Sequence, residues 1–204
     1  GKRDKSDHKV TDLLYMCHQL ADHNIDCSEV FAVIRERIKD IHQQLQLSVD
    51  IDPVLDQIYQ QISAGASADF VASRGEYLSA ILLADYLGYE FVDAAEVVIF
   101  DEDGTWNADS TEAAVAARLA NVPDAVIPGF YGASPSGTIF TFSRGGSDVT
   151  GAIIANGVGA TLYENWTDVS GFLKADPGIV ADAHPIAEVS YKELRELSYM
   201  GAPV

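Results

Sequence analysis

Apolar residues in the first third of the chain recur every three or four positions, which is the spacing of one helix face. Residues 9–46 therefore predict two helices, with a break near residues 23–27. A further helix is expected near residues 53–62, and another should begin at the cap Ser67 and end at Gly88, because serine favours helix starts and glycine helix ends. The apolar positions of the first two helices are Val10, Leu13, Leu14, Cys17, Leu20, Val30, Ile34, Ile38, Ile41 and Leu45.

Beyond residue 90 the pattern changes to short apolar runs bounded by Gly, Pro or Asp, which are typical of buried strands. Helical patterns near residues 111–120, 147–156 and 189–200 separate these runs. The alternation predicts an α/β fold, with a mostly parallel sheet and helices on its faces. Because such folds usually open with a strand, we expect at least one opening strand to be missing. The predicted strands are residues 95–100, 124–130, 139–142 and 160–163.

Size and charge restrict the function. The 204 residues, 48% of them hydrophobic, suffice for one domain or a piece of one. The formal charge of 13 − 31 = −18 opposes binding to nucleic acid or to an anionic membrane. No apolar span approaches the ~20 residues that cross a bilayer. Cys17 and Cys27 have no companion cysteines, which favours a reducing, cytoplasmic setting, and the histidines show no metal-ligand spacing.

The most informative segment is the turn from Ser143 to Thr150, which lies between an apolar run and a helical pattern. Paired glycines allow the backbone to approach a ligand closely, and amides at a helix start attract anions. Arg144 can bind a carboxylate or phosphate with its planar guanidinium. Asp148 can hold a cationic partner or help to organise a metal-nucleotide. A tight structural turn is the alternative interpretation.

Two other segments carry candidate chemistry. Glu76 follows Arg74 and Gly75 within an apolar helical pattern and could receive a substrate ammonium group, although a solvated carboxylate has the same pattern. Thr167 and Asp168 follow an apolar run and precede a glycine bend. Open α/β sheets bind ligands at such carboxyl ends of strands, so nucleotide binding is plausible there, with an ordinary capped turn as the alternative.

Four segments of the chain together resemble the catalytic domain of aspartate kinase, because they follow one another in the same order as in that family and at similar separations. The resemblance implies the αβα sandwich of the amino-acid kinases, lacking its first strand. It also implies transfer of the γ-phosphoryl group from ATP, which carries Mg²⁺, to the side-chain carboxylate of L-aspartate. The product, 4-phospho-L-aspartate, leads toward lysine, threonine and methionine. The segments are residues 9–14, 73–79, 142–151 and 166–177.

The resemblance also implies roles for single residues. Arg144 would pair with a substrate carboxylate and Glu76 with the substrate ammonium. Asp148 matches a position that organises catalytic lysines. No metal ligand is implied. The positions that match aspartate binding are Thr11, Glu76, Arg144, Gly146 and Ser147, and those that match nucleotide binding are Thr167 and Asp168.

The chain departs from the family pattern on the nucleotide side. It starts after the Lys-Phe-Gly-Gly strand that holds the ATP phosphates, and the regulatory domains that follow the kinase domain are absent. Leu173, Gly178 and Pro203 replace a tyrosine, an arginine and a lysine. Lys174 could reach a phosphate instead, or be an ordinary solvated lysine. We therefore expect residues 1–204 to be a partial catalytic domain, poorly active alone.

Two other functions stay open. The chain could be a non-catalytic module for amino-acid binding or assembly, or a sister kinase that acts on another amino-acid carboxylate. We expect the full-length protein to be a homo-oligomer.

Overall fold

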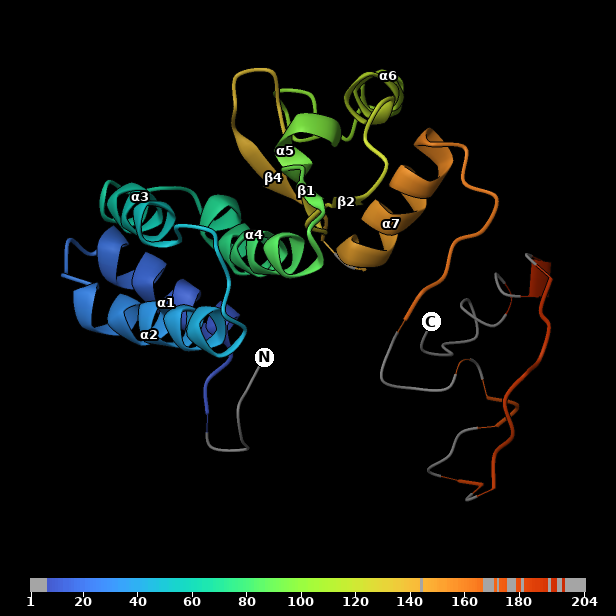
Figure 1. The fold of residues 1–204 in the computed structure, drawn as a ribbon, viewed down its shortest axis with the longest axis horizontal. Helices are drawn as coiled ribbons and strands as arrows, with labels where there is room; N and C mark the ends of the chain where they lie inside the picture. Colours follow the sequence, from blue (N-terminus) through green and yellow to red (C-terminus); the bar gives the residue numbers. More distant parts are fainter. Residues whose placement is uncertain are drawn as a thin grey trace. The chain divides into compact units, whose positions relative to one another are not determined.

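The computed structural model describes residues 7–143, 145–166, 171, 173–175, 179–180, 182–190, 192–193 and 196. The chain divides into two compact units, residues 1–163 and residues 164–204, and each is described by itself. The labelled helices and strands, α1 to α7 and β1 to β4, lie in the first unit (Figure 1).

The first helices form where the apolar spacing predicts them. Their apolar faces pack into one core, in which Leu14, Ile34, Leu55 and Leu78 are almost fully buried. The predicted break near residues 23–27 and the helix near residues 53–62 are confirmed. The helices are α1 (Val10–Asp22), α2 (Ser28–Gln44), α3 (Asp52–Ser63) and α4 (Ala68–Leu87).

Helix α4 joins the helical core to the strands. It begins at the predicted cap, where the Phe70 N–H donates to Oγ of Ser67 at 3.2 Å, and it ends at Gly88 with the left-handed φ of 69° that glycine tolerates. Along its length it contacts α1 and three of the strands. Because it is covered on several sides, this helix lacks a single polar face.

The strands are shorter than predicted. Strands β1 (Glu90–Phe91) and β2 (Ala125–Val126) pair in parallel, and β3 (Tyr131–Ala133) and β4 (Ile139–Thr141) pair in an antiparallel hairpin. The remaining helices are α5 (Ala94–Val97), α6 (Ala108–Leu119) and α7 (Gly146–Gly157). Helix α4 packs against β1, β2 and β4, and α5 packs against β3. Helices α6 and α7 pack against each other beside the strands (Figure 1).

The α/β class is confirmed, but two predicted strands are wrong. Residues 94–97 are helical, because the Asp93 carboxylate caps them by accepting from the Ala95 N–H at 3.0 Å, and only Ile99 and Phe100 of that run pair in bridges. Residues 160–163 form no strand, since the Ala160 N–H bonds back to Ala155 at the end of α7. An apolar run alone does not distinguish these cases.

In the second unit, Leu173 pairs with Pro185 in an antiparallel bridge, and the Lys174 N–H donates to the His184 carbonyl at 2.9 Å. The helix predicted over residues 189–200 lies mostly outside the described residues, of which Lys192, Glu193 and Glu196 are helical. No helix in the described part of the chain is long and apolar enough to cross a membrane.

Candidate functional site

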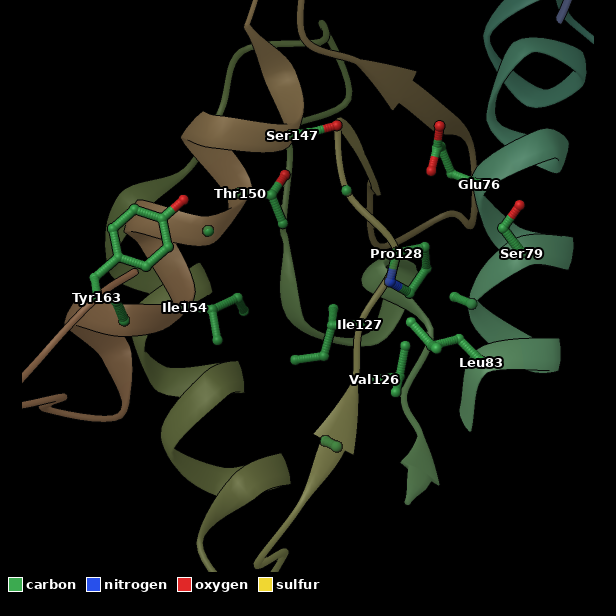
Figure 2. A pocket seen from close by; sticks show the side chains of 15 residues that line it. Glu76, Ser79, Leu83, Val126, Ile127, Pro128, Ser147, Thr150, Ile154 and Tyr163 are labelled. Carbon is green, nitrogen blue, oxygen red and sulfur yellow. The ribbon is translucent and has the colours of Figure 1, made fainter. Parts of the chain in front are cut away.

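A pocket of about 510 Å³ opens in the first unit between α4, β2 and α7 (Figure 2). Strand β2 and the residues that follow it, through Gly129, form its floor. Ser79 and Leu83 on α4 and Ile154 on α7 belong to its walls. The polar side chains Glu76, Ser147 and Thr150 lie toward one end, and Leu83, Val126 and Ile127 toward the other. The pocket therefore has a polar end and an apolar end.

The pocket brings together two of the segments singled out in the sequence. Glu76 lines it from α4 and Ser147 from the first turn of α7, so they stand on different walls of one cavity (Figure 2). Both are exposed, and among the described residues neither side chain has a hydrogen-bond or ion-pair partner. A carboxylate and a hydroxyl are thus available to a ligand in the same pocket.

The glycines of the predicted anion turn have structural reasons to be glycine. Gly145 has a left-handed φ of 58° at the start of α7. A Cβ atom on Gly146 would lie 2.5 Å from Cβ of Phe130. The side of Gly146 that lacks a side chain therefore faces Phe130 rather than an open ligand space. Arg144 lies outside the described residues.

Arg74 and Glu76, on either side of Gly75 in α4, lie in different surroundings. Glu76 is exposed in the pocket, whereas Arg74 is 5% exposed and stacks on aromatic rings, with its guanidinium carbon 4.3 Å from the centre of Tyr77 and 5.3 Å from that of Tyr131. The Tyr131 hydroxyl donates to Asp93 at 2.6 Å, and burial raises the pKa of this phenol. Arg74 therefore stabilises the junction between α4 and β3.

The other predicted site residues of the first unit do not line this pocket. Thr11 is exposed on α1, one residue after Val10, whose side chain lies against Gly75 of α4, but Thr11 does not line the pocket. Asp148 is exposed on the first turn of α7 and does not line it either. Lys174 is exposed in the second unit. Thr167 and Asp168 lie outside the described residues, as do Gly178 and Pro203.

Sequence reasoning missed several residues of the pocket. The sequence pattern gives no role to the buried hydroxyl of Thr150 in the Ser143–Thr150 turn, and it indicates only strand for Tyr163 and for the segment from Ala125 to Gly129. The signal for Tyr163 is Gly151, whose absent side chain leaves room for the tyrosine ring on α7.

Within the described part of the chain, no group of three or more His, Cys, Asp or Glu residues could hold a metal ion.

Comparison with known proteins identifies relatives of this chain. The model of the amino acid kinase family matches residues 10–204. Aspartokinase 3 of Bacillus subtilis is 35% identical over 218 residues, which cover 100% of this chain and 48% of that protein. A crystal structure of Clostridium acetobutylicum aspartate kinase is 51% identical, with a TM-score of 0.94, and the match covers 100% of this chain and 47% of that one.

A structure of Escherichia coli aspartokinase III, in complex with aspartate and ADP, is similar in fold, with a TM-score of 0.77 at 24% identity over 96% of this chain and 48% of that one. The chain thus spans about half the length of the relatives it matches. These matches confirm the predicted amino-acid kinase fold and the resemblance to aspartate kinase.

Proposed function

The chain belongs to the amino acid kinase family, and we propose that the protein it forms part of is an aspartate kinase. In this reaction the γ-phosphoryl group of ATP passes to the side-chain carboxylate of L-aspartate and gives 4-phospho-L-aspartate, on the route toward lysine, threonine and methionine. The observation that carries the proposal is the pocket that Glu76 and Ser147 share, because both residues come from segments that match the aspartate kinase pattern.

The charges of L-aspartate suit the residues assigned to it. The substrate has one ammonium group and two carboxylates, so its site needs a fixed carboxylate and at least one strong cationic donor. Glu76 would receive the ammonium group, and Arg144 would pair with a carboxylate. Ser147 would donate its hydroxyl to a substrate oxygen, and Gly146 and Thr11 would complete the aspartate side.

The roles that we propose for residues on the nucleotide side of the site are based on the family resemblance. Thr167 and Asp168 would contact ATP, Lys174 would reach a phosphate, and Mg²⁺ would arrive with the nucleotide. Asp148 would organise the lysines that neutralise the transferred group. Phosphoryl transfer requires mainly positioning and neutralisation of charge, so the protein would supply catalysis through these contacts rather than through a covalent intermediate.

We propose that a further strand completes this side of the domain. Within the described residues, β2 pairs with β1 along one edge only, and the segment from Ala125 to Gly129 lines the pocket between α4 and α7. An unpaired strand edge is a template for another strand. The Lys-Phe-Gly-Gly strand expected from the resemblance would suit this edge, and without it residues 1–204 should turn over poorly.

Replacement of Glu76 tests the aspartate site. In the whole protein, Glu76→Gln keeps the size of the side chain but removes the charge that would bind the ammonium group. We expect the KM for L-aspartate to rise about tenfold to a hundredfold, because hydrogen bonds to charged groups contribute roughly 1.5–3 kcal/mol, while the KM for ATP changes less than twofold. Steady-state ADP formation measures both constants.

Glu36→Gln is the matched control, since Glu36 is an exposed carboxylate on α2 that does not line the pocket. It should leave both constants unchanged. Equal effects of the two substitutions, or an unchanged KM for aspartate in Glu76→Gln, would remove Glu76 from the site. A non-catalytic binding module would instead bind aspartate through Glu76 without forming ADP, and a sister kinase would prefer another amino acid in a substrate panel.

A further inference from the structure

Phe130, just before β3, binds both ends of the turn that carries Ser147. Its carbonyl accepts a hydrogen bond from the N–H of Phe142 at 2.8 Å, immediately before the turn. Its own N–H donates to Oγ1 of Thr150 at 3.0 Å, on α7 after the turn. Phe142 and Thr150, which flank the turn, are therefore both hydrogen-bonded to the backbone of one residue.

The backbone of Phe130 is itself held in an unfavourable conformation. Its φ is 65°, in the left-handed region that a bulky side chain rarely adopts. Such a conformation persists only where the surrounding structure imposes it. Close packing imposes the conformation here. Gly146 lies so near Phe130 that a Cβ atom on Gly146 would not fit. A Cβ atom on Gly129, the neighbour of Phe130, would lie 2.9 Å from Cα of Ser147.

The Thr150 hydroxyl completes this contact. Thr150 is 3% exposed, and its hydroxyl donates to the Gly146 carbonyl at 2.8 Å while it accepts from Phe130. The hydroxyl therefore donates its one proton within α7, and its oxygen accepts the hydrogen bond from the Phe130 N–H. Although Thr150 lines the pocket, its hydroxyl bonds to protein backbone on both sides.

We propose that Thr150 is a positioning residue, which acts through Phe130 to hold the first turn of α7 so that Ser147 faces the pocket. The inference rests on the proposed function, because the substrate of that turn would be L-aspartate. Thr150 would touch no reacting atom. Its loss would misplace the aspartate side of the site, and misplacement by about 1 Å can lower catalytic efficiency on the order of a hundredfold.

The test compares Thr150→Val with Thr150→Ser in the whole protein. Valine has nearly the shape of threonine but neither donates nor accepts, whereas serine keeps the hydroxyl. We expect Thr150→Val to raise the KM for L-aspartate at least tenfold and to change the KM for ATP less than twofold, and we expect Thr150→Ser to stay within threefold of the unmodified protein. If Thr150→Val fails to fold, Thr150→Ala provides the same comparison.

Thr111→Val is a matched control. Thr111 is 1% exposed, and its hydroxyl also accepts from a backbone N–H, that of Ile99 at 2.9 Å, and donates to the Ile99 carbonyl at 3.3 Å, but it does not line this pocket. Its replacement should lower Tm and leave both KM values unchanged. An unchanged KM for aspartate in Thr150→Val, or equal increases in the valine and serine variants, overturns the positioning role.

A second readout separates this inference from the proposed function. Amide hydrogen exchange of Phe130, measured by NMR, should be at least tenfold faster in Thr150→Val than in the unmodified chain and unchanged in Thr111→Val. If the whole protein forms no ADP in response to L-aspartate, the proposed function fails, and the Phe130 exchange rate alone decides: faster exchange supports the structural contact, and equal exchange overturns it.

Discussion

Glu76 and Ser147 could be singled out from the sequence because each lies in a short segment with unusual chemistry for its surroundings. Glu76 interrupts an apolar helical pattern, and Ser147 follows paired glycines at a helix start. Their meeting in one pocket could not be predicted from spacing, since it depends on α4 and α7 lying on either side of the β2 segment. Phe130 was missed for a similar reason, because a left-handed φ at a phenylalanine leaves no signal in the sequence.

Cys17 gives a prediction that concerns a single thiol. Burial, together with the neighbouring Cys27, raises the pKa of Cys17 from 9.0 to about 12. The unfolded chain therefore releases this proton near pH 9, while the folded chain keeps it, so the stabilisation is complete below pH 9 and is lost as the pH rises toward 12. Urea unfolding between pH 8 and 11 should show a free energy of unfolding that falls above about pH 9.

Cys17→Val separates this thiol from the other alkaline groups. Burial also raises the pKa of Tyr77 and of Tyr131, so part of the decline will remain in the variant. One proton contributes a slope of about 1.4 kcal/mol per pH unit between the two pKa values. A slope between pH 9 and 10 that is identical in the variant and the unmodified chain would show that Cys17 titrates normally in the native state.

Among the elements, the long helices were predictable; of the strands, β2 and β4 lie within predicted runs, whereas β1 and β3 were not predicted. Helices α1 to α4 each show several turns of apolar spacing, and Ser67 and Gly88 mark the ends of α4. The strands have only two or three residues each, which is too short for an alternation of apolar and polar residues to be recognised in the sequence. Their pairing depends on contacts with residues distant in the chain, such as Phe91 with Val126.

Gly146→Ala tests the contact between the start of α7 and the segment before β3. The added Cβ atom would meet Cβ of Phe130 at 2.5 Å and its Cα at 2.8 Å, so the backbone must shift. Overpacking of this kind costs about 1–3 kcal/mol. We expect Tm to fall by several degrees in a thermal melt.

Gly75→Ala is the corresponding control within α4. Its Cβ atom would lie 3.6 Å from Leu14 and 3.7 Å from Val10, which are ordinary contacts, and alanine is favoured over glycine inside a helix by about 1 kcal/mol. This variant should melt at or above the temperature of the unmodified chain. If Gly146→Ala melts no lower than Gly75→Ala, the close contact with Phe130 is not a constraint on the fold.

At the scale of the whole chain, the 204 residues carry a net charge of −18. A field of this sign opposes the approach of anions, so under the proposed function Arg144 and Lys174 would have to attract ATP and L-aspartate locally. The amino-acid kinase fold was predictable because four motifs occur in the right order. Only the comparison with relatives showed that the chain spans about half of their length.

The most direct test is L-aspartate-dependent formation of ADP from MgATP by the whole protein, with the acyl phosphate product trapped as its hydroxamate. We predict saturable ADP formation that requires L-aspartate and yields one hydroxamate per ADP, and little turnover by residues 1–204 alone. ADP formation that does not depend on L-aspartate, or aspartate binding without any ADP, would contradict the proposal that this protein is an aspartate kinase.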